Sequence, residues 1–151
     1  MRSLLRAEDR RDLEAPLDAL RPGTHRRWGR MSVEGMVCHL TDSFLAVLGE
    51  RPAGRVPKLH ERTLMRWIAL STPVPWPKGV PTIDARDQER GGTPPESLEP
   101  DKARLRQVID RFLVGIEAGT MAHPLFGEMS AAEWGRWAYR HMDHHFRQFS
   151  A

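Results

Sequence analysis

The sequence predicts an all-α fold, most simply a four-helix bundle with one long Pro/Gly-rich connection. Apolar residues recur with the i, i+3, i+4, i+7 spacing of amphipathic helices in several segments. No run of β-branched residues alternates with polar ones, as it would in a half-buried strand. The length of 151 residues suits one domain, which we place over residues 1–151.

The first half of the chain contains three helical patterns. A short helix is expected over about residues 9–20, and Pro16 breaks its middle or marks a restart, because an interior proline costs about 3 kcal/mol. Ser32 is the expected N-cap of a second helix, which Gly49 closes. A third helix is expected over about residues 58–70, where apolar residues are frequent but poorly spaced.

The second half consists of a long connection and two further helices. Residues 71–97 hold six prolines and three glycines, which exclude regular structure over most of the segment. A loop of this length is either functional or partly disordered. The fourth helix is expected to begin near Leu98 and to end at Gly119. Ser130 and Glu133 form the S-x-x-E capping box of a last helix that runs almost to the end of the sequence.

The composition argues against several classes of protein. The formal net charge is only +3, and the arginines are interleaved with acids, so we expect no nucleic-acid partner. The sequence contains no run of about 18 apolar residues, so we predict no membrane span. The N-terminal residues lack a secretory signal, and the single cysteine, Cys38, excludes an internal disulfide, which together predict a cytoplasmic protein. We interpret Cys38 as a small core or boundary residue.

Two histidines on the last predicted helix are the most informative residues. His141 and His145 lie one turn apart on the apolar face, where a globular helix normally carries Leu or Ile. Buried ring nitrogens need a partner, and an H-x-x-x-H pair of neutral imidazoles suits a transition metal. The alternative is a pair of core histidines bonded to one another or to Gln148. His123, which precedes a proline in a predicted turn, is expected to be structural.

A third metal ligand has to come from another helix. His39, at the edge of the apolar stripe of the second helix, is the candidate, and the alternative is a boundary histidine half in water. Asp42 lies one turn away and could bond the second ring nitrogen of His39, although a solvated acid is the simpler interpretation. His144, at the edge of the last helical stripe, could replace either ligand of that helix. Trp76 indicates that the long loop packs against something.

Several segments resemble known proteins. Residues 28–40 resemble the start of the second helix in the DinB-like superfamily, where a tryptophan and a serine N-cap precede a histidine ligand. Residues 141–148 resemble its last-helix motif, H-x-x-x-H followed by a glutamine. The closer match is to a bacterial branch known only as a domain of unknown function, which shares Trp-Pro-Lys-Gly at 76–79 and His-Pro-Leu-Phe-Gly at 123–127. The resemblance covers about residues 8–149.

The resemblance implies a four-helix bundle with a three-histidine metal site at one end of its interior. The implied ligands are His39, His141 and His145, and Gln148 matches the glutamine that follows them. Better-known members of the superfamily are metal-dependent transferases that use low-molecular-weight thiols, and related isomerases. The expected cofactor is therefore a divalent transition metal (Zn, Ni, Fe or Mn), and the expected partners are a small-molecule thiol and an electrophilic substrate.

Three imidazoles would leave an open coordination position, which is typical of a catalytic site because structural zinc usually has four protein ligands. A thiol bound there would lose its proton and attack an electrophilic carbon, with Trp76 and its loop shaping the substrate pocket. The alternative is a non-catalytic binding or stress-response module in which the metal is structural or absent. A homodimer is also expected, because bundles with an apolar outer face often dimerise.

Overall fold

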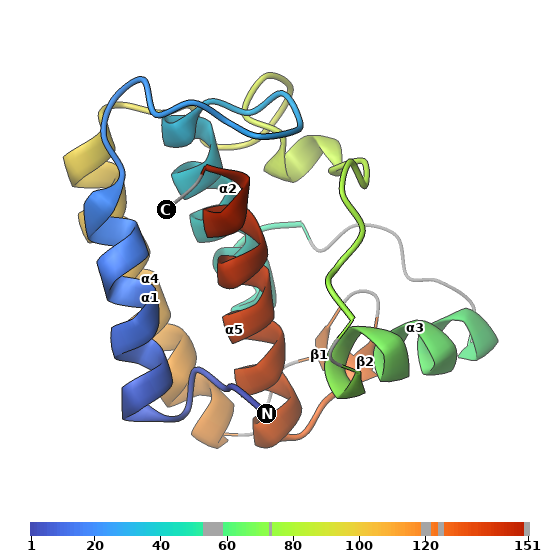
Figure 1. Ribbon diagram of the computed structural model, residues 1–151. Helices are drawn as coiled ribbons and strands as arrows, with labels where there is room; N and C mark the ends of the chain where they lie inside the picture. Colours follow the sequence, from blue (N-terminus) through green and yellow to red (C-terminus); the bar gives the residue numbers. More distant parts are fainter. Residues whose placement is uncertain (53–58, 73, 119–121, 124–125, 150–151) are drawn as a thin grey trace.

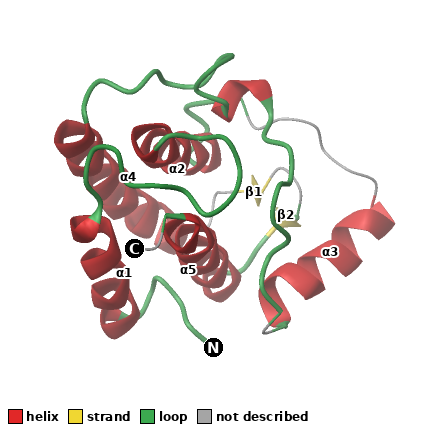
Figure 2. Ribbon diagram, turned by 45° about the horizontal axis from the view of Figure 1, so that its top comes forward, coloured by secondary structure: helices red, strands yellow, loops and turns green. Residues whose placement is uncertain are grey.

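The computed structural model describes residues 1–52, 59–72, 74–118, 122–123 and 126–149. Its five α-helices are α1 (Ala7–Ala19), α2 (Val33–Val47), α3 (Leu59–Ser71), α4 (Leu98–Ala118) and α5 (Ala131–Gln148). The prediction of a helical protein is confirmed. Helices α1, α2, α4 and α5 pack together, whereas α3 projects to one side and touches α5 (Figures 1 and 2). Over the described part of the chain, every helix is too short or too polar to cross a membrane.

Three short elements complete the fold. A single 3-10 turn, η1 (Asp84–Arg86), interrupts the long connection and contacts α2. Strands β1 (Ala122–His123) and β2 (Gly127–Glu128) pair antiparallel over two residues each, at the turn predicted before the last helix. Gly119, predicted to end the fourth helix, and residue 58, predicted to begin the third, lie outside the described residues.

Helix α1 continues through Pro16, so the prediction that this proline breaks the helix is wrong. Leu13 and Leu17 on either side of it are buried. Burial of each leucine is worth about 1.5–3 kcal/mol, which offsets the cost of an interior proline. No basic residue lies in the last turn of α1. Instead, Nζ of the buried Lys102 on α4 donates to the carbonyl of Leu20, at 2.9 Å, and so satisfies the helix end.

Helix α2 lies beside α4 (Figure 2) and also contacts α5 and η1. Every residue from Val33 to Val47 except Glu34 is buried. Its N-cap is Ser32, whose Oγ accepts from the Gly35 amide at 3.0 Å, as the sequence predicts. Gly49 follows the helix end with φ of +77°, a left-handed conformation that glycine adopts without strain.

The long connection between α3 and α4 is attached to α2 through Asp42. This carboxylate is fully buried. It accepts hydrogen bonds from the backbone amide and the hydroxyl of Thr93, at 2.7 and 2.6 Å, and pairs with Nε of Arg51 at 2.9 Å. The connection is otherwise irregular, as its proline and glycine content predicts, and these contacts hold it against the face of α2 that carries His39.

Helix α5 begins with the predicted capping box. Oγ of Ser130 accepts from the Glu133 amide, and the Glu133 carboxylate accepts from the Ser130 amide at 2.9 Å. The same carboxylate binds Arg66 of α3 at 2.6 Å, which joins the two helices. Beyond the first turn, α5 buries Trp134 and Trp137 in the aromatic core, and this packing sets the orientation of the histidines that follow.

Candidate metal centre

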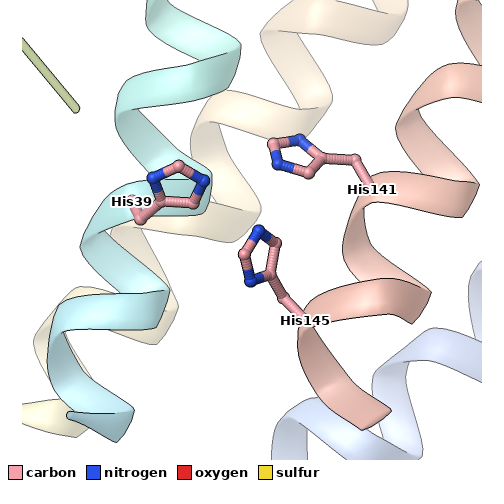
Figure 3. Close-up of side chains that lie close together, drawn as sticks. All are labelled: His39, His141 and His145. Atoms are coloured by element: carbon pink, nitrogen blue, oxygen red, sulfur yellow. The ribbon is translucent and has the colours of Figure 1, made fainter. Parts of the chain in front are cut away.

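Three buried histidines from two helices lie together between α2 and α5 (Figure 3). One ring nitrogen from each of His39, His141 and His145 lies within 4.8 Å of the other two. Their exposed fractions are 6, 8 and 7%, respectively, and the rings point toward one another. The three residues predicted as ligands are therefore brought together by the fold, and the set could hold a metal ion.

Backbone from the long connection orients His39. Its Nδ1 lies 2.9 Å from the carbonyl oxygen of Arg86 in η1. Because a carbonyl only accepts hydrogen bonds, Nδ1 carries the proton and Nε2 keeps its lone pair. The predicted partner of that nitrogen, Asp42, is instead used by Thr93 and Arg51, so this prediction is wrong. The alternative of a solvated Asp42 is also wrong, because the carboxylate is fully buried.

The amide of Gln148 orients His145. Nε2 of Gln148 donates to the carbonyl of Trp28 at 2.9 Å, which places Oε1 of the amide 3.1 Å from Nδ1 of His145. The imidazole must therefore donate from Nδ1, and its Nε2 keeps the lone pair. A hydrogen bond between this histidine pair and Gln148 is what the alternative of core histidines predicts, and His145 makes it. His39 and His145 thus both present an unprotonated Nε2.

His141 is held by packing rather than by a hydrogen bond. Its ring lies 5.1 Å from the ring of Trp137 and 5.8 Å from that of Trp76. Within the described residues, its buried Nδ1 has no hydrogen-bond partner. A buried polar atom without a partner carries a desolvation cost, which a cation bound at this nitrogen would help to offset.

The surroundings of the cluster keep all three imidazoles neutral. Burial lowers the pKa of His39, and it lowers those of His141 and His145 well below the usual value. The neighbouring imidazoles lower the last two further, since a charge on one ring opposes protonation of the next. Three neutral nitrogen donors on a rigid pair of helices suit a borderline metal ion such as Zn²⁺.

Two partly buried side chains flank the cluster. Trp76 lies 5.8 Å from His141 and 6.2 Å from His144, measured between ring centroids, and its Nε1 donates to the Ala69 carbonyl at 3.1 Å. His144 lies between Trp76 and Trp28, beside the three-histidine set rather than within it. Trp76 is thus adjacent to the site for which the sequence proposed it.

A separate cavity of about 370 Å³ opens near the start of α2. Its lining includes His25, Ser32 and Phe149 but none of the three clustered histidines. This cavity is therefore not the approach to the candidate metal centre.

Two other predictions concern buried groups away from the cluster. Burial and the neighbouring Asp101 raise the pKa of the Cys38 thiol to about 12, and its 3% exposure fits the predicted core residue. Burial and the charge of Arg86 lower the pKa of His123 to about 3. The His123 ring stacks on Phe126 with centroids 4.5 Å apart, which fits the structural role predicted for it.

Sequence reasoning gave no role to three residues that the structure places around the histidines. Arg86 supplies the carbonyl that orients His39, Trp28 lies beside His144, and Lys78 lies over the Trp28 ring. A periodicity argument does not reach them, because Trp28 and Lys78 lie in irregular segments and Arg86 ends a single 3-10 turn. The only signal in the sequence was that Trp28 and Lys78 belong to the short motifs that carry the family resemblance.

The fold and the site together define a helical protein with a buried three-histidine cluster able to hold a metal ion. A family model described as "Protein of unknown function (DUF1569)" matches residues 2–151, and the chain belongs to this family. No curated protein and no solved structure matches the chain. The expected relationship to a family of unknown function is confirmed, and that family supplies no activity.

Proposed function

We propose that the protein is a metal-dependent enzyme in which His39, His141 and His145 bind one divalent transition ion, either Zn, Ni, Fe or Mn. The observation that carries this proposal is the convergence of three neutral imidazoles, two of which have a tautomer fixed by a hydrogen bond at Nδ1. We also propose that α1, α2, α4 and α5 form a DinB-like four-helix bundle, because the ligands come from the two helices that this resemblance implies.

The proposed reaction class is transfer to a low-molecular-weight thiol. A divalent ion with three protein ligands supplies Lewis acidity at its remaining position. The residues of the chain contribute orientation and exclusion of water. Gln148 and the Arg86 carbonyl hold two rings in place, and Trp76 covers His141. Fixed ligand geometry of this kind reduces the reorganisation needed when a substrate binds.

A non-catalytic module is the second candidate, and a specific observation favours it. His39 and His145 already have protein hydrogen-bond partners at Nδ1. Histidines satisfied in this way can be core residues without a metal ion. In that case the cluster would stabilise the contact between α2 and α5 and would catalyse no reaction.

Elemental analysis of untagged protein distinguishes the two candidates. We expect about one transition metal ion per chain in the wild type, and its loss in the His141→Ala/His145→Ala double variant. His144→Ala, one residue away but outside the cluster, is the matched control and should retain the ion. A wild type that holds no metal after reloading with Zn, Ni, Fe and Mn would support the module instead. If metal is retained, an added thiol that changes the spectrum of the Co²⁺-loaded protein would show an open position.

A further inference from the structure

Lys78 lies close to the cluster, in a turn of the long connection. Gly79 follows it with φ of +72°, a conformation that favours glycine, and so the turn is set by the Pro77–Lys78–Gly79 sequence. The exposed lysine reaches back over the protein, and its Nζ lies 4.4 Å from the centroid of the Trp28 ring. This is a cation–π contact, which leaves ammonium hydrogens available on the side away from the ring.

Aromatic rings connect this lysine to the candidate metal centre. The Trp28 ring lies 5.9 Å from His144, and His144 lies 5.2 Å from His145. On the other side of His144, Trp76 lies 6.2 Å away and also contacts His141. Trp28 and Trp76 thus lie on two sides of His144, with Lys78 beyond Trp28 and the histidine cluster beyond His144.

Residues of α5 anchor both tryptophans. Gln148 donates to the carbonyl of Trp28, at 2.9 Å. Arg140 lies over the Trp76 ring, 5.9 Å from its centroid, and its guanidinium donates to the carbonyls of Thr72 and Val74. The position of Lys78 relative to the histidines therefore depends on contacts to the same helix that carries two of them, which makes it a preorganised site.

The charge around these rings is positive. Among the described residues, no carboxylate forms an ion pair with Lys78, and Asp143, the acid beside His144, is paired with Arg147 at 2.9 Å. An anion would find a favourable potential here.

We propose that Lys78 binds the carboxylate of a small-molecule substrate whose carbon skeleton lies along Trp28 and Trp76 and whose reacting end reaches the histidine cluster. This proposal rests on the proposed function, because it assigns a substrate class to the same site. It predicts selection of carboxylate-bearing thiols over neutral thiols of equal length. The role of Lys78 is recognition and positioning, without proton transfer.

The test compares matched thiols on the Co²⁺-loaded protein. The probes are 3-mercaptopropionate with 2-mercaptoethanol, and 6-mercaptohexanoate with 6-mercaptohexanol, each titrated by the thiolate absorption of cobalt. We expect the wild type to bind one of the acids about three- to fivefold more tightly than its alcohol at low salt, a preference that falls as salt rises. Lys78→Met should abolish the preference and Lys78→Arg should keep it. Arg11→Met, which removes an exposed cation from α1, should leave it unchanged.

A preference that survives in Lys78→Met would overturn the proposal, since it would show that the carboxylate contacts the metal or another group. Tryptophan fluorescence titrations of the metal-free protein with the same four probes separate this result from failure of the proposed function. Absence of cobalt uptake together with a Lys78-dependent preference in fluorescence would contradict the metal centre and support the anion site. Cobalt uptake without any preference would support the metal centre and contradict the anion site.

Discussion

The side-chain amide of Gln148 bonds the ring of His145 on one side and the backbone of Trp28 on the other. Because the amide nitrogen must donate to the Trp28 carbonyl, the amide oxygen faces His145. The imidazole proton therefore lies on Nδ1 of His145. A segment before α2 therefore fixes which ring nitrogen of His145, a candidate ligand on α5, keeps its lone pair. A glutamine suits this position, because its amide carries an accepting oxygen and a donating nitrogen at the end of one side chain.

Replacing Gln148 should weaken metal binding without removing a ligand. In Gln148→Met the imidazole of His145 loses its acceptor and is free to adopt the other tautomer. We expect about 10- to 100-fold weaker binding of Zn²⁺, the usual cost of losing a hydrogen bond to a ligand. Competition titration with a chromogenic chelator measures the change. Gln107→Met, at an exposed position of α4, is the control, and equal affinities in the two variants would contradict the assigned role.

Gly29 should be sensitive for the same reason. A Cβ at this position would lie 2.6 Å from Nε2 of Gln148, and φ is +74°. Gly29→Ala should therefore lower both the free energy of unfolding and the metal affinity. Gly23→Ala is a matched control, because φ is +78° there but no atom lies within 4 Å of the added carbon. Both variants pay the free-energy cost of placing an alanine in a left-handed backbone conformation, about 1–2 kcal/mol. Any loss of metal affinity should be confined to Gly29→Ala.

The metal-free protein should lose stability as the pH falls below the usual histidine pKa of about 6.5. His39, His141 and His145 have folded-state pKa values below that of the unfolded chain, and that of His123 is about 3. Below pH 6.5 the unfolded chain binds protons that the folded chain does not, so the free energy of unfolding declines with falling pH. Each such histidine contributes up to about 1.4 kcal/mol per pH unit.

Urea unfolding between pH 7.5 and 5.0 measures this slope. Replacing His123 by Phe removes one titrating group that stays neutral in the folded state, so this variant should show a shallower decline than the wild type. A free energy of unfolding that stays constant over this range would show that the buried histidines take up protons while folded, contrary to their burial.

Lys102 should contribute to stability through the end of α1. Its buried Nζ donates to the Leu20 carbonyl and pairs with Glu99 at 2.8 Å. Lys102→Met keeps the apolar stem but removes one of the two donors to this carbonyl, because Nη1 of Arg21 also donates to it at 2.9 Å. We expect a loss of about 0.5–1.5 kcal/mol. Chemical denaturation measures it, with Lys78→Met as the exposed control. A loss no greater than that of the control would mean that Arg21 alone satisfies the carbonyl.

The parts of the fold that were predicted from the sequence depend on local patterns. Ser32 and Ser130 cap α2 and α5 because their hydroxyls reach backbone amides within one turn, and this information lies in a few consecutive residues. His141 and His145 could be assigned to one face by helical spacing. His39 needed the family resemblance as well, because spacing alone placed it at the edge of its stripe.

The parts that were not predicted depend on contacts between distant segments. Asp42 was expected to contact His39 or water, yet residues 51 and 93 bind its carboxylate. The hydrogen-bond partner of His39 is instead the backbone carbonyl of Arg86 in the 3-10 turn. Pro16 was expected to break a helix that tertiary packing maintains. In each case the deciding partner lies in another element, where propensity and periodicity carry no information.

Arg140 and His141 are neighbours in the chain with different tasks. The Arg140 side chain donates hydrogen bonds to the carbonyls of Thr72 and Val74, just before Trp76. The His141 side chain belongs to the histidine cluster. A rotation of α5 about its axis would turn both at once. The position of the loop that covers the cluster is therefore coupled to the position of α5, which helps to form the cluster. A displacement of Trp76 would move Arg140, which is adjacent in sequence to the candidate ligand His141.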